Sequence, residues 1–219
     1  MTINTKTLAA IDIGTNAIRL FISNVEEYPT ETLFKKIAFL RVPIRLGEDV
    51  FTTGEIGQQK RKRLCETMQG FSYIMSAFNV ESYKAYATCA MREARNGKSV
   101  AEQIQKECDL NIEIISGTKE AETIFAGGMN EVVDDDKTYL YVDVGGGSTE
   151  VIVYSKSVKV EACSFPLGTV RMLNDAVDKE EMKHFKKWLK NITEKYTPDA
   201  IIGSGGNINK IHKLLNKKE

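Results

Sequence analysis

The chain of 219 residues has no excess of either charge, since 30 Lys and Arg are balanced by 30 Asp and Glu. No overall field gathers a polyanion, so any polyanionic ligand has to be held by local basic groups. No apolar run approaches 18 residues, which argues against a membrane-spanning helix. The polar residues 1–7, and Asp12 within the next apolar run, predict that no signal peptide is present.

Cysteine and histidine are also scarce. The four cysteines are Cys65, Cys89, Cys108 and Cys163. They show neither C-x-x-C nor paired metal-ligand spacing, so we expect reduced thiols in a cytoplasmic protein. The two histidines, His184 and His212, are expected at exposed positions, and no histidine chemistry is predicted.

A basic run at residues 60–63 is the one sequence feature that suggests nucleic-acid binding. It has no interleaved aromatic residues of the kind on which bases stack. We therefore interpret it as the solvated face of a helix and expect no nucleic-acid partner.

The stretch Asp143–Glu150 reads Asp-Val-Gly-Gly-Gly-Ser-Thr-Glu between two apolar runs. The pattern predicts two strands joined by a tight turn, because glycine adopts backbone angles that other residues avoid. Unpaired N–H groups of such a turn form a concavity for phosphate oxygens, and Asp143 at the strand end could hold a cation. A glycine-rich hairpin without a ligand is the alternative at this point.

A second copy of this stretch lies near the N-terminus. Residues 11–22 align without gaps with residues 142–153 and keep the order apolar, Asp, apolar, Gly. An internal repeat of this size predicts paired lobes whose turns face each other across a ligand cleft. After the turn, one copy offers Arg19 as an anion clamp and the other offers Glu150 as a carboxylate. Chance similarity between two hairpins is the alternative.

Hydrophobic periodicity predicts an α/β chain. Strands are expected at residues 8–13, 19–25, 31–44, 82–88, 111–115, 139–142, 151–154, 157–164 and 199–203. Helices are expected from residue 53 to about 79, at 99–108, from 118, and at 170–176, 180–196 and 208–215. We expect two domains, residues 1–125 and 126–219, with a charged turn at 134–137 marking the passage into the second.

Two further segments suit phosphate binding. Arg92 and Arg95 follow an expected strand at its carboxyl end, where ligands of open α/β sheets gather. Arginine can pair two phosphate oxygens at once, although Arg95 has local hydrogen bonding as an equal alternative. Gly205 and Gly206 form a glycine turn that opens the last expected helix, and a helix N-terminus of this kind favours anions.

Six motifs, in this order, resemble the Ppx/GppA family of exopolyphosphatases and guanosine pentaphosphate phosphohydrolases. They are AAIDIGTNAIRL, ATCAMREARNG, IISGTKEA, VDVGGGSTE, PLGTVRM and IIGSGGNI. The family belongs to the actin, Hsp70 and sugar-kinase superfamily, so the resemblance implies a two-domain actin-like (ribonuclease H-like) fold. The match runs from Ala9 to about Leu215. Family members continue beyond this point, so we expect a second domain that is truncated at its C-terminus.

The resemblance implies Mg²⁺-dependent release of the terminal phosphate of inorganic polyphosphate, or of the 5′ phosphate of guanosine pentaphosphate. Glu120 takes the place of the family's general base, although Lys119 stands where many members carry a second acid. Asp143 and Glu150 are the other expected catalytic residues, and with Asp12 they are the expected metal ligands. The expected phosphate-binding residues are Gly14, Thr15, Asn16, Arg19, Arg92, Gly145, Gly146, Gly147, Ser148, Thr149, Gly205 and Gly206.

Two other function classes stay open. A sugar- or acetate-kinase-like phosphotransferase shares the paired phosphate turns, and a sensor without turnover would bind guanosine tetraphosphate or polyphosphate and release nothing. The expected partners are therefore polyphosphate or guanosine penta- or tetraphosphate, without nucleic acid or membrane. A truncated second domain would expose on the order of several hundred Å² of apolar surface, so low stability, low turnover or a homodimer is expected.

Overall fold

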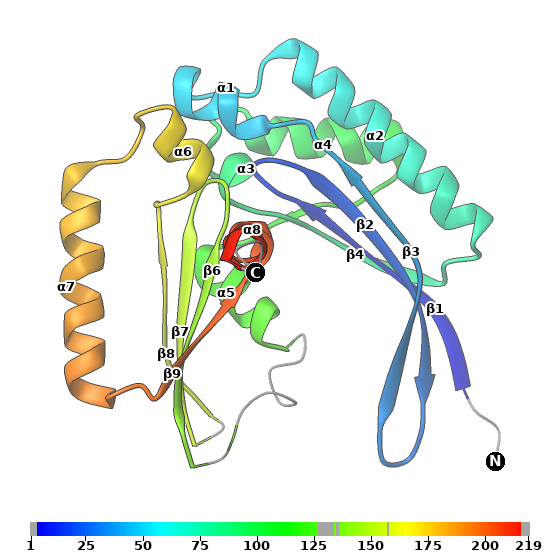
Figure 1. Ribbon diagram of the computed structural model, residues 1–219. Coiled ribbons are helices and arrows are strands. Elements are labelled where there is room, and N and C mark those ends of the chain that lie inside the picture. The colour runs from blue at the N-terminus through cyan, green and yellow to red at the C-terminus, as the bar shows by residue number, and fades with distance from the viewer. Residues whose placement is uncertain (1–3, 127–133, 135, 157, 216–219) are drawn as a thin grey trace. The chain divides into compact units, whose positions relative to one another are not determined.

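The computed structural model describes residues 4–126, 134, 136–156 and 158–215, and the chain divides into two compact units, Met1–Ile115 and Ser116–Glu219. Each unit is a β-sheet with its own helices (Figure 1). The division falls before α5 (Gly117–Ala126), earlier than the expected boundary after residue 125. The reason is that Ala121 of α5 is fully buried against Tyr141 and Ile152 of the second sheet.

The first unit contains a five-stranded sheet in the order β3-β2-β1-β4-β5. Its strands are β1 (Asn4–Ile13), β2 (Ile18–Glu27), β3 (Thr32–Val42), β4 (Ser82–Ala87) and β5 (Glu113–Ile114). β1, β2 and β3 form an antiparallel hairpin and third strand, and β4 pairs in parallel with β1 and with β5. All five expected strands are present, although β5 is shorter than predicted.

The helices of the first unit correct one prediction. They are α1 (Leu46–Thr53), α2 (Gln58–Ala77), α3 (Cys89–Glu93) and α4 (Gly97–Cys108). The helix expected to start at residue 53 starts at Gln58 instead, because Gly54 ends α1. Gly54 has a φ of 80°, the left-handed conformation in which helices commonly terminate. Leu64, Met68 and Phe71 of α2 lie in the core.

The second unit contains a four-stranded sheet in the order β8-β7-β6-β9. Its strands are β6 (Thr138–Val144), β7 (Thr149–Ser155), β8 (Val158–Phe165) and β9 (Ala200–Ser204). Its further helices are α6 (Thr169–Leu173), α7 (Lys179–Tyr196) and α8 (Gly205–Leu215). Gly205 and Gly206 open the last helix, as expected, and β9 passes directly into α8 at Gly205.

Two helices cover opposite faces of the second sheet. On one face α5 packs on Tyr139, Tyr141 and Ile152, and on the other α7 packs on Leu140 and Val151. This alternation follows from the period of two residues in a strand.

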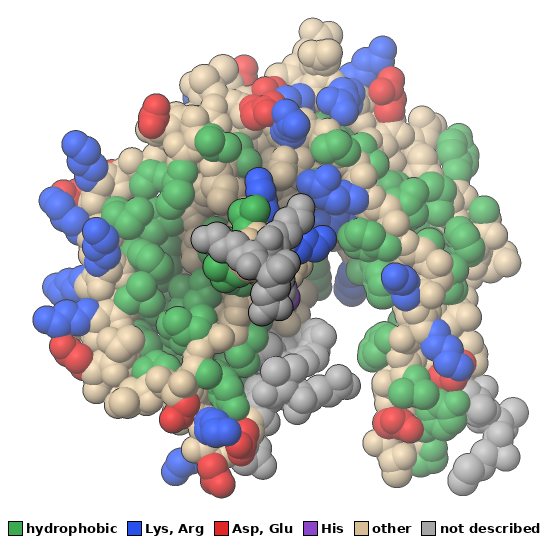
Figure 2. All heavy atoms as spheres, viewed as in Figure 1, with side chains coloured by type: hydrophobic (Ala, Val, Ile, Leu, Met, Phe, Trp, Pro, Cys, Tyr) green, Lys and Arg blue, Asp and Glu red, His purple; other side chains and the backbone are tan. Residues whose placement is uncertain are grey.

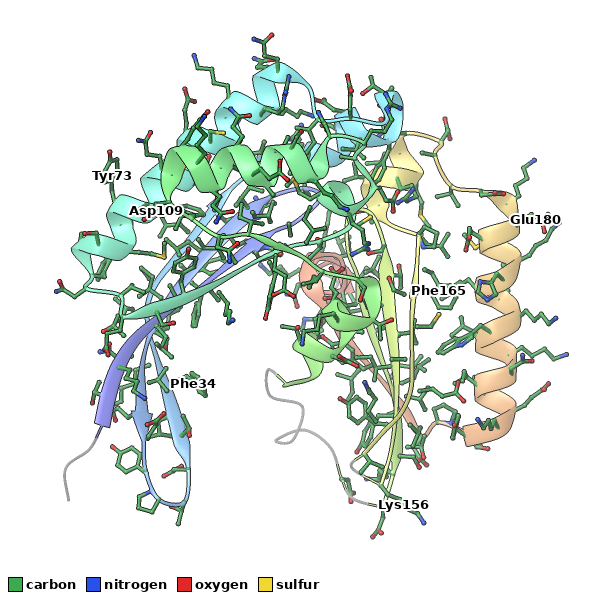
Figure 3. All side chains as sticks on the ribbon, turned by 180° about the vertical axis from the view of Figure 1, so that it is seen from behind. Phe34, Tyr73, Asp109, Lys156, Phe165 and Glu180 are labelled. Atoms are coloured by element: carbon green, nitrogen blue, oxygen red, sulfur yellow. The ribbon has the colours of Figure 1, made fainter. Side chains whose placement is uncertain are left out.

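The apolar stripe of α7 meets the sheet through aromatic rings. Phe165 of β8 has its ring centroid 4.9 Å from that of Phe185 and 5.4 Å from that of Trp188 (Figure 3). Lys and Arg side chains lie along the outer side of the helix (Figure 2). The side chain of His184 is 60% exposed, as expected, with its ring edge against Phe165.

The repeat seen in the sequence extends through most of each unit. A hairpin, a third antiparallel strand, two helices and a parallel fourth strand follow in the same order in both. In the first unit these are β1, β2, β3, α1, α2 and β4, and in the second they are β6, β7, β8, α6, α7 and β9. Chance similarity of two hairpins is therefore rejected. In the part of the chain that the structure describes, no helix is both long and apolar enough to span a bilayer.

Cys65 and Cys108 are buried together between α2 and α4. The Cys108 thiol donates to the backbone oxygen of Cys65 at 3.6 Å. Burial raises the pKa of the Cys65 thiol from 9.0 to about 11, and the nearby Glu107 adds to the effect. The folded state therefore favours the protonated thiol.

We expect Cys65 to react slowly with a thiol reagent such as DTNB at pH 8 in the native protein, because the nucleophile is the thiolate. The rate should rise sharply in denaturant. The associated stability is fully present below pH 9 and declines as the pH rises through about 11, since only the unfolded thiol ionises easily in that interval. Equal rates in the native and the denatured protein would contradict this assignment.

Candidate functional site

The hairpin of the first unit turns through residues 14–17. The N–H of Gly14 donates to the carbonyl of Ala17 at 3.2 Å and closes the turn. The two carbonyls in between accept from the amides of Gly47 (3.0 Å) and Arg45 (2.9 Å), where α1 begins. Among the described residues, the amides of residues 15–17 donate to no protein acceptor. The turn thus offers the unpaired N–H groups that the sequence predicts for a phosphate site.

Asp12 and Arg19 lie opposite each other where this hairpin approaches its turn. Their side chains form a direct ion pair, although 40% of Asp12 and 46% of Arg19 remain exposed. Burial raises the pKa of the Asp12 carboxyl, and the charge and hydrogen bond of Arg19 oppose the shift. Arg19 is therefore held by the carboxylate of Asp12, and a bound phosphate would have to share the Arg19 guanidinium with that carboxylate.

Arg92 lies on α3, which starts two residues after the end of β4. The N–H of Thr88 donates to the carbonyl of Ile13 at 3.2 Å, so the ends of β1 and β4 are adjacent. The Arg92 guanidinium donates to the carbonyl of Ile115 at 2.8 Å. Arg92 thus lies at the carboxyl edge of the first sheet, where the sequence places it.

Arg95 has the local role that was its alternative. Its guanidinium donates to the carbonyl of Thr53 at 2.9 Å and lies over Gly54, where a Cβ would come within 2.3 Å of Nη1. The end of α1 therefore positions this arginine.

The hairpin of the second unit turns through residues 145–148 in the same way. The N–H of its first residue donates to the carbonyl of its last at 2.9 Å. The carbonyls of the three glycines accept from the amides of Thr169 (3.0 Å) and Val170 (2.8 Å) and from Nε of Arg171 (2.9 Å). Within the described ranges, the amides of residues 146–148 donate to no protein acceptor. In both copies of the repeat, donors at the start of a later helix, α1 or α6, bind the carbonyls of the turn. The amides of the turn are left for a ligand.

Two hydroxyl residues expected to bind phosphate follow these glycines, and both are buried. Ser148 is 4% and Thr149 is 5% exposed. The Thr149 hydroxyl donates to the carbonyl of Leu167, which fixes the segment before α6. The structure gives Thr149 a structural contact, and its role toward phosphate stays a prediction.

Asp143 and Glu150 are cross-strand partners, so their carboxylates lie on one face of the second sheet. Glu150 is 2% exposed and accepts from the hydroxyl of Ser164 at 2.8 Å. Gly205 lies against Asp143, because a Cβ there would come within 2.5 Å of Oδ1. The start of α8 thus approaches Asp143 closely, and the φ of 90° at Gly205 favours glycine for a second reason.

A buried tyrosine extends this polar group. The Tyr141 hydroxyl donates to the Ser204 hydroxyl at 2.6 Å. Burial raises the pKa of Tyr141, the bond to Ser204 opposes this shift, and the carboxylates of Asp143 and Glu150 add to it. The phenol therefore stays protonated and serves as a donor near the two acids.

Glu120 lies in the first turn of α5. This helix begins with the hydroxyl of Ser116 accepting from the amide of Lys119 at 3.1 Å, and Glu120 is half-buried. Its neighbour Ala121 packs on the face of the second sheet that also carries Asp143 and Glu150. Two of the three expected catalytic residues are thus brought together, and the third lies on the helix that covers the same face.

The metal ligands expected from the sequence are divided between the units, with Asp12 in the first. Among the described residues, no three His, Cys, Asp or Glu side chains form a group that could hold a metal ion by themselves. Asp143 and Glu150 remain as an adjacent pair of carboxylates. Such a pair suits Mg²⁺, which is usually held by one or two carboxylates together with water and substrate phosphates.

The model of the Ppx/GppA phosphatase family matches residues 22–211. The chain belongs to this family. It is 32% identical over 168 residues to a bifunctional 3-dehydroquinate synthase/phosphatase of Fusobacterium nucleatum, covering 75% of this chain and 25% of that protein. It is 28% identical over 170 residues to exopolyphosphatase 2 of Mycobacterium tuberculosis, covering 75% of this chain and 53% of that one. The chain thus spans a quarter to about half of these relatives.

Solved structures show the two-domain actin-like fold of this Ppx/GppA chain. An exopolyphosphatase of Cytophaga hutchinsonii has a TM-score of 0.83 at 24% identity, with 98% of this chain and 72% of that chain covered. The Aquifex aeolicus Ppx/GppA family member has a TM-score of 0.70 at 28% identity, with 93% and 67% covered.

No role was predicted for Arg171, which is 8% exposed and reaches the glycine turn at residues 145–148. A signal was present, because it stands in the PLGTVRM motif of this Ppx/GppA chain, three residues after Gly168. Ser164 was also missed, since a serine in an apolar strand shows its carboxylate partner only once the strand register is known.

Proposed function

We propose that this chain contributes the phosphate-releasing site of a hydrolase that acts on inorganic polyphosphate or on the 5′ phosphate of guanosine pentaphosphate. The observation that carries the proposal is the second hairpin, where a turn with unpaired amides lies beside the carboxylates of Asp143 and Glu150. Relatives named exopolyphosphatase support the choice of reaction. No disulfide joins the described cysteines, which suits the cytoplasm.

The proposed roles follow from the charge that phosphoryl transfer has to accommodate. Such transfer depends mainly on positioning and on electrostatic stabilisation of the phosphoryl oxygens. Arg19, Arg92 and the turn amides would neutralise these oxygens. Gly205 would serve by allowing α8 close to Asp143, and Gly206 stays a predicted phosphate contact. Glu120 would accept a proton from the attacking water.

Mg²⁺ fits the donors of the second unit. Asp143 and Glu150 would hold it, with Asp12 retained as a predicted third ligand. Bound Mg²⁺ would supply positive charge to the phosphate oxygens. The hydrogen bond from the Ser164 hydroxyl holds one carboxylate oxygen of Glu150 in place, and this contact does not depend on a bound cation.

Replacing Asp143 with Asn should raise the Mg²⁺ concentration needed for half-maximal activity, since a hard cation prefers charged oxygen ligands. We expect a shift of about tenfold or more, because a hydrogen bond or ligand contact to a charged group is worth roughly 1.5–3 kcal/mol. Titration of Mg²⁺ at saturating substrate measures it. Ser204→Ala is the control, because it removes the partner of Tyr141 and leaves the carboxylates. An unchanged Mg²⁺ response of Asp143→Asn would make this aspartate structural.

Three assays separate the proposed hydrolase from its alternatives. Release of phosphate from polyphosphate or guanosine pentaphosphate without an acceptor supports a hydrolase. Product formation that requires ATP and an acceptor would indicate a sugar- or acetate-kinase-like phosphotransferase. Binding of guanosine tetraphosphate without any phosphate release would indicate a sensor. Homodimer formation stays a prediction that solution mass measurements check.

A further inference from the structure

A groove of about 440 Å³ lies between α2 and α4 of the first unit. The two helices start together, because the side-chain amide of Asn96 donates to the carbonyl of Ile56 and accepts from its N–H, both at 2.9 Å. Further along they meet again, where the Cys108 thiol donates to the carbonyl of Cys65. The volume of the groove is in the range of small-molecule binding sites.

Two thiols form the floor of this groove. Cys65 and Cys108 are each 8% exposed and belong to the core of the unit, whereas the other side chains that line the groove are polar or charged. A protonated thiol behaves as a small polarisable hydrophobic group. The groove therefore offers an apolar base inside a polar rim.

Arg61 of α2 lines the groove and has no partner for its charge. Its guanidinium forms no ion pair with the residues that the structure describes, and its Nε is buried without a hydrogen-bond acceptor. The next cation, Lys62, lies 3.9 Å from the carboxylate of Glu66. An unsatisfied buried donor costs stability, and more so when it belongs to a charged group. An acceptor in the groove would remove this cost once the Arg61 guanidinium turns toward it.

Glu107 of α4 supplies the opposite charge on the other wall. Its carboxylate accepts from the side-chain amide of Gln103 at 2.9 Å and from the Cys65 thiol, and within the described ranges it forms no ion pair. Burial is the main cause of the raised pKa of this thiol, Glu107 adds to the rise, and the charge of Arg61 opposes it. An unpaired cation and an unpaired anion therefore lie near the same sulfur atom without pairing with each other.

We propose that this groove binds a free α-amino acid with an apolar side chain. The carboxylate of the ligand meets Arg61, its ammonium group meets Glu107, and its side chain lies against the two thiols. An α-amino acid fits because it carries both charges on one carbon, and because a guanidinium pairs well with a planar carboxylate. A simple anion would be repelled by Glu107, and a simple amine would leave Arg61 unsatisfied. The phosphate-releasing site proposed above uses none of these residues, so the amino acid is a second ligand with a site of its own.

The test measures dissociation constants by NMR titration with three probes of one carbon skeleton. L-leucine carries both charges, L-leucinamide lacks the carboxylate, and 4-methylpentanoate lacks the ammonium group. Leucine should bind tightest, and each analogue about tenfold more weakly, because a hydrogen bond to a charged group is lost. Arg61→Gln should weaken leucine and 4-methylpentanoate by about the same factor and should not weaken leucinamide. Glu107→Gln should weaken leucine and leucinamide and should not weaken 4-methylpentanoate.

Arg63→Gln is the matched control. Arg63 lies two residues from Arg61 on the same helix, but it donates to the carbonyl of Pro43 at 3.3 Å and does not line the groove. Its substitution should leave the affinities for all three probes unchanged. A selective loss, in which each variant loses only the probes with the matching charge, cannot result from unfolding.

Three outcomes overturn the proposal. They are the absence of leucine binding to the unmodified chain, binding of 4-methylpentanoate as tight as that of leucine, and an equal loss of all three probes in both variants. The second outcome would indicate a site for simple anions. None of these results depends on phosphate release, by which the hydrolase assignment is tested.

Discussion

Glu120→Gln should lower phosphate release by about 10²–10⁴-fold, the usual loss when a general base is removed. Glutamine keeps the shape of the side chain and the first turn of α5, but it cannot accept the proton of the attacking water. Substrate affinity should change little, because the substitution removes a proton acceptor and leaves the phosphate contacts. Single-turnover rates and dissociation constants, measured on both polyphosphate and guanosine pentaphosphate, separate the two effects.

The same helix offers a matched control for Glu120. Glu122 is exposed and pairs with Lys159 of β8 at 3.2 Å, a surface ion pair worth roughly 0.2–1 kcal/mol. Glu122→Gln should therefore retain turnover with at most a small loss of stability. If Glu120→Gln were as active as Glu122→Gln, Glu120 would not be the base.

The hairpins of both units could be predicted from the sequence because their signals are local. Alternating apolar residues require strands, and Gly14 and Gly145 mark turns in which a Cβ would come within 3.1 Å of the closing carbonyl. Because the two copies of the repeat align without gaps, the residues that precede and follow each turn could be predicted as well. Arg92 was also placed correctly, since the carboxyl end of a parallel strand is a position that topology alone defines.

The contacts that hold the turns could not be predicted, because they come from distant segments. In the sequence, Gly54 is compatible with either the start or the end of a helix. Its φ of 80° and its contact with Arg95, which only the structure shows, place it at the end of α1. The close approach of Gly205 to Asp143 likewise depends on β9 lying beside β6. The ion pair between Asp12 and Arg19 needs the cross-strand register, which residue types alone do not give.

The placement of Gly168 leads to the second large effect. A Cβ at this position would come within 2.4 Å of the backbone of both Gly146 and Gly147, so the obstacle is main chain that cannot rotate away. Gly168→Ala must therefore separate α6 from the glycine turn. Overpacking of this kind costs about 1–3 kcal/mol, and a displacement of roughly 1 Å at a reacting group can cost about 10²-fold in rate. We expect a lower melting temperature and about 10²-fold slower phosphate release.

The same substitution elsewhere should act in the opposite direction. Gly70 lies inside α2, and apart from the adjoining backbone of its own helix no atom comes within 4 Å of the position its Cβ would take. Gly70→Ala should raise stability by roughly 0.5–1 kcal/mol, because alanine loses less backbone entropy in a helix. Thermal melts and phosphate release of the two variants, measured side by side, make the comparison. If Gly168→Ala had the same melting temperature and the same rate of phosphate release as Gly70→Ala, the glycine turn at residues 145–148 would not depend on α6. The carbonyl contacts from Thr169 and Val170 would then have no part in presenting the amides to phosphate.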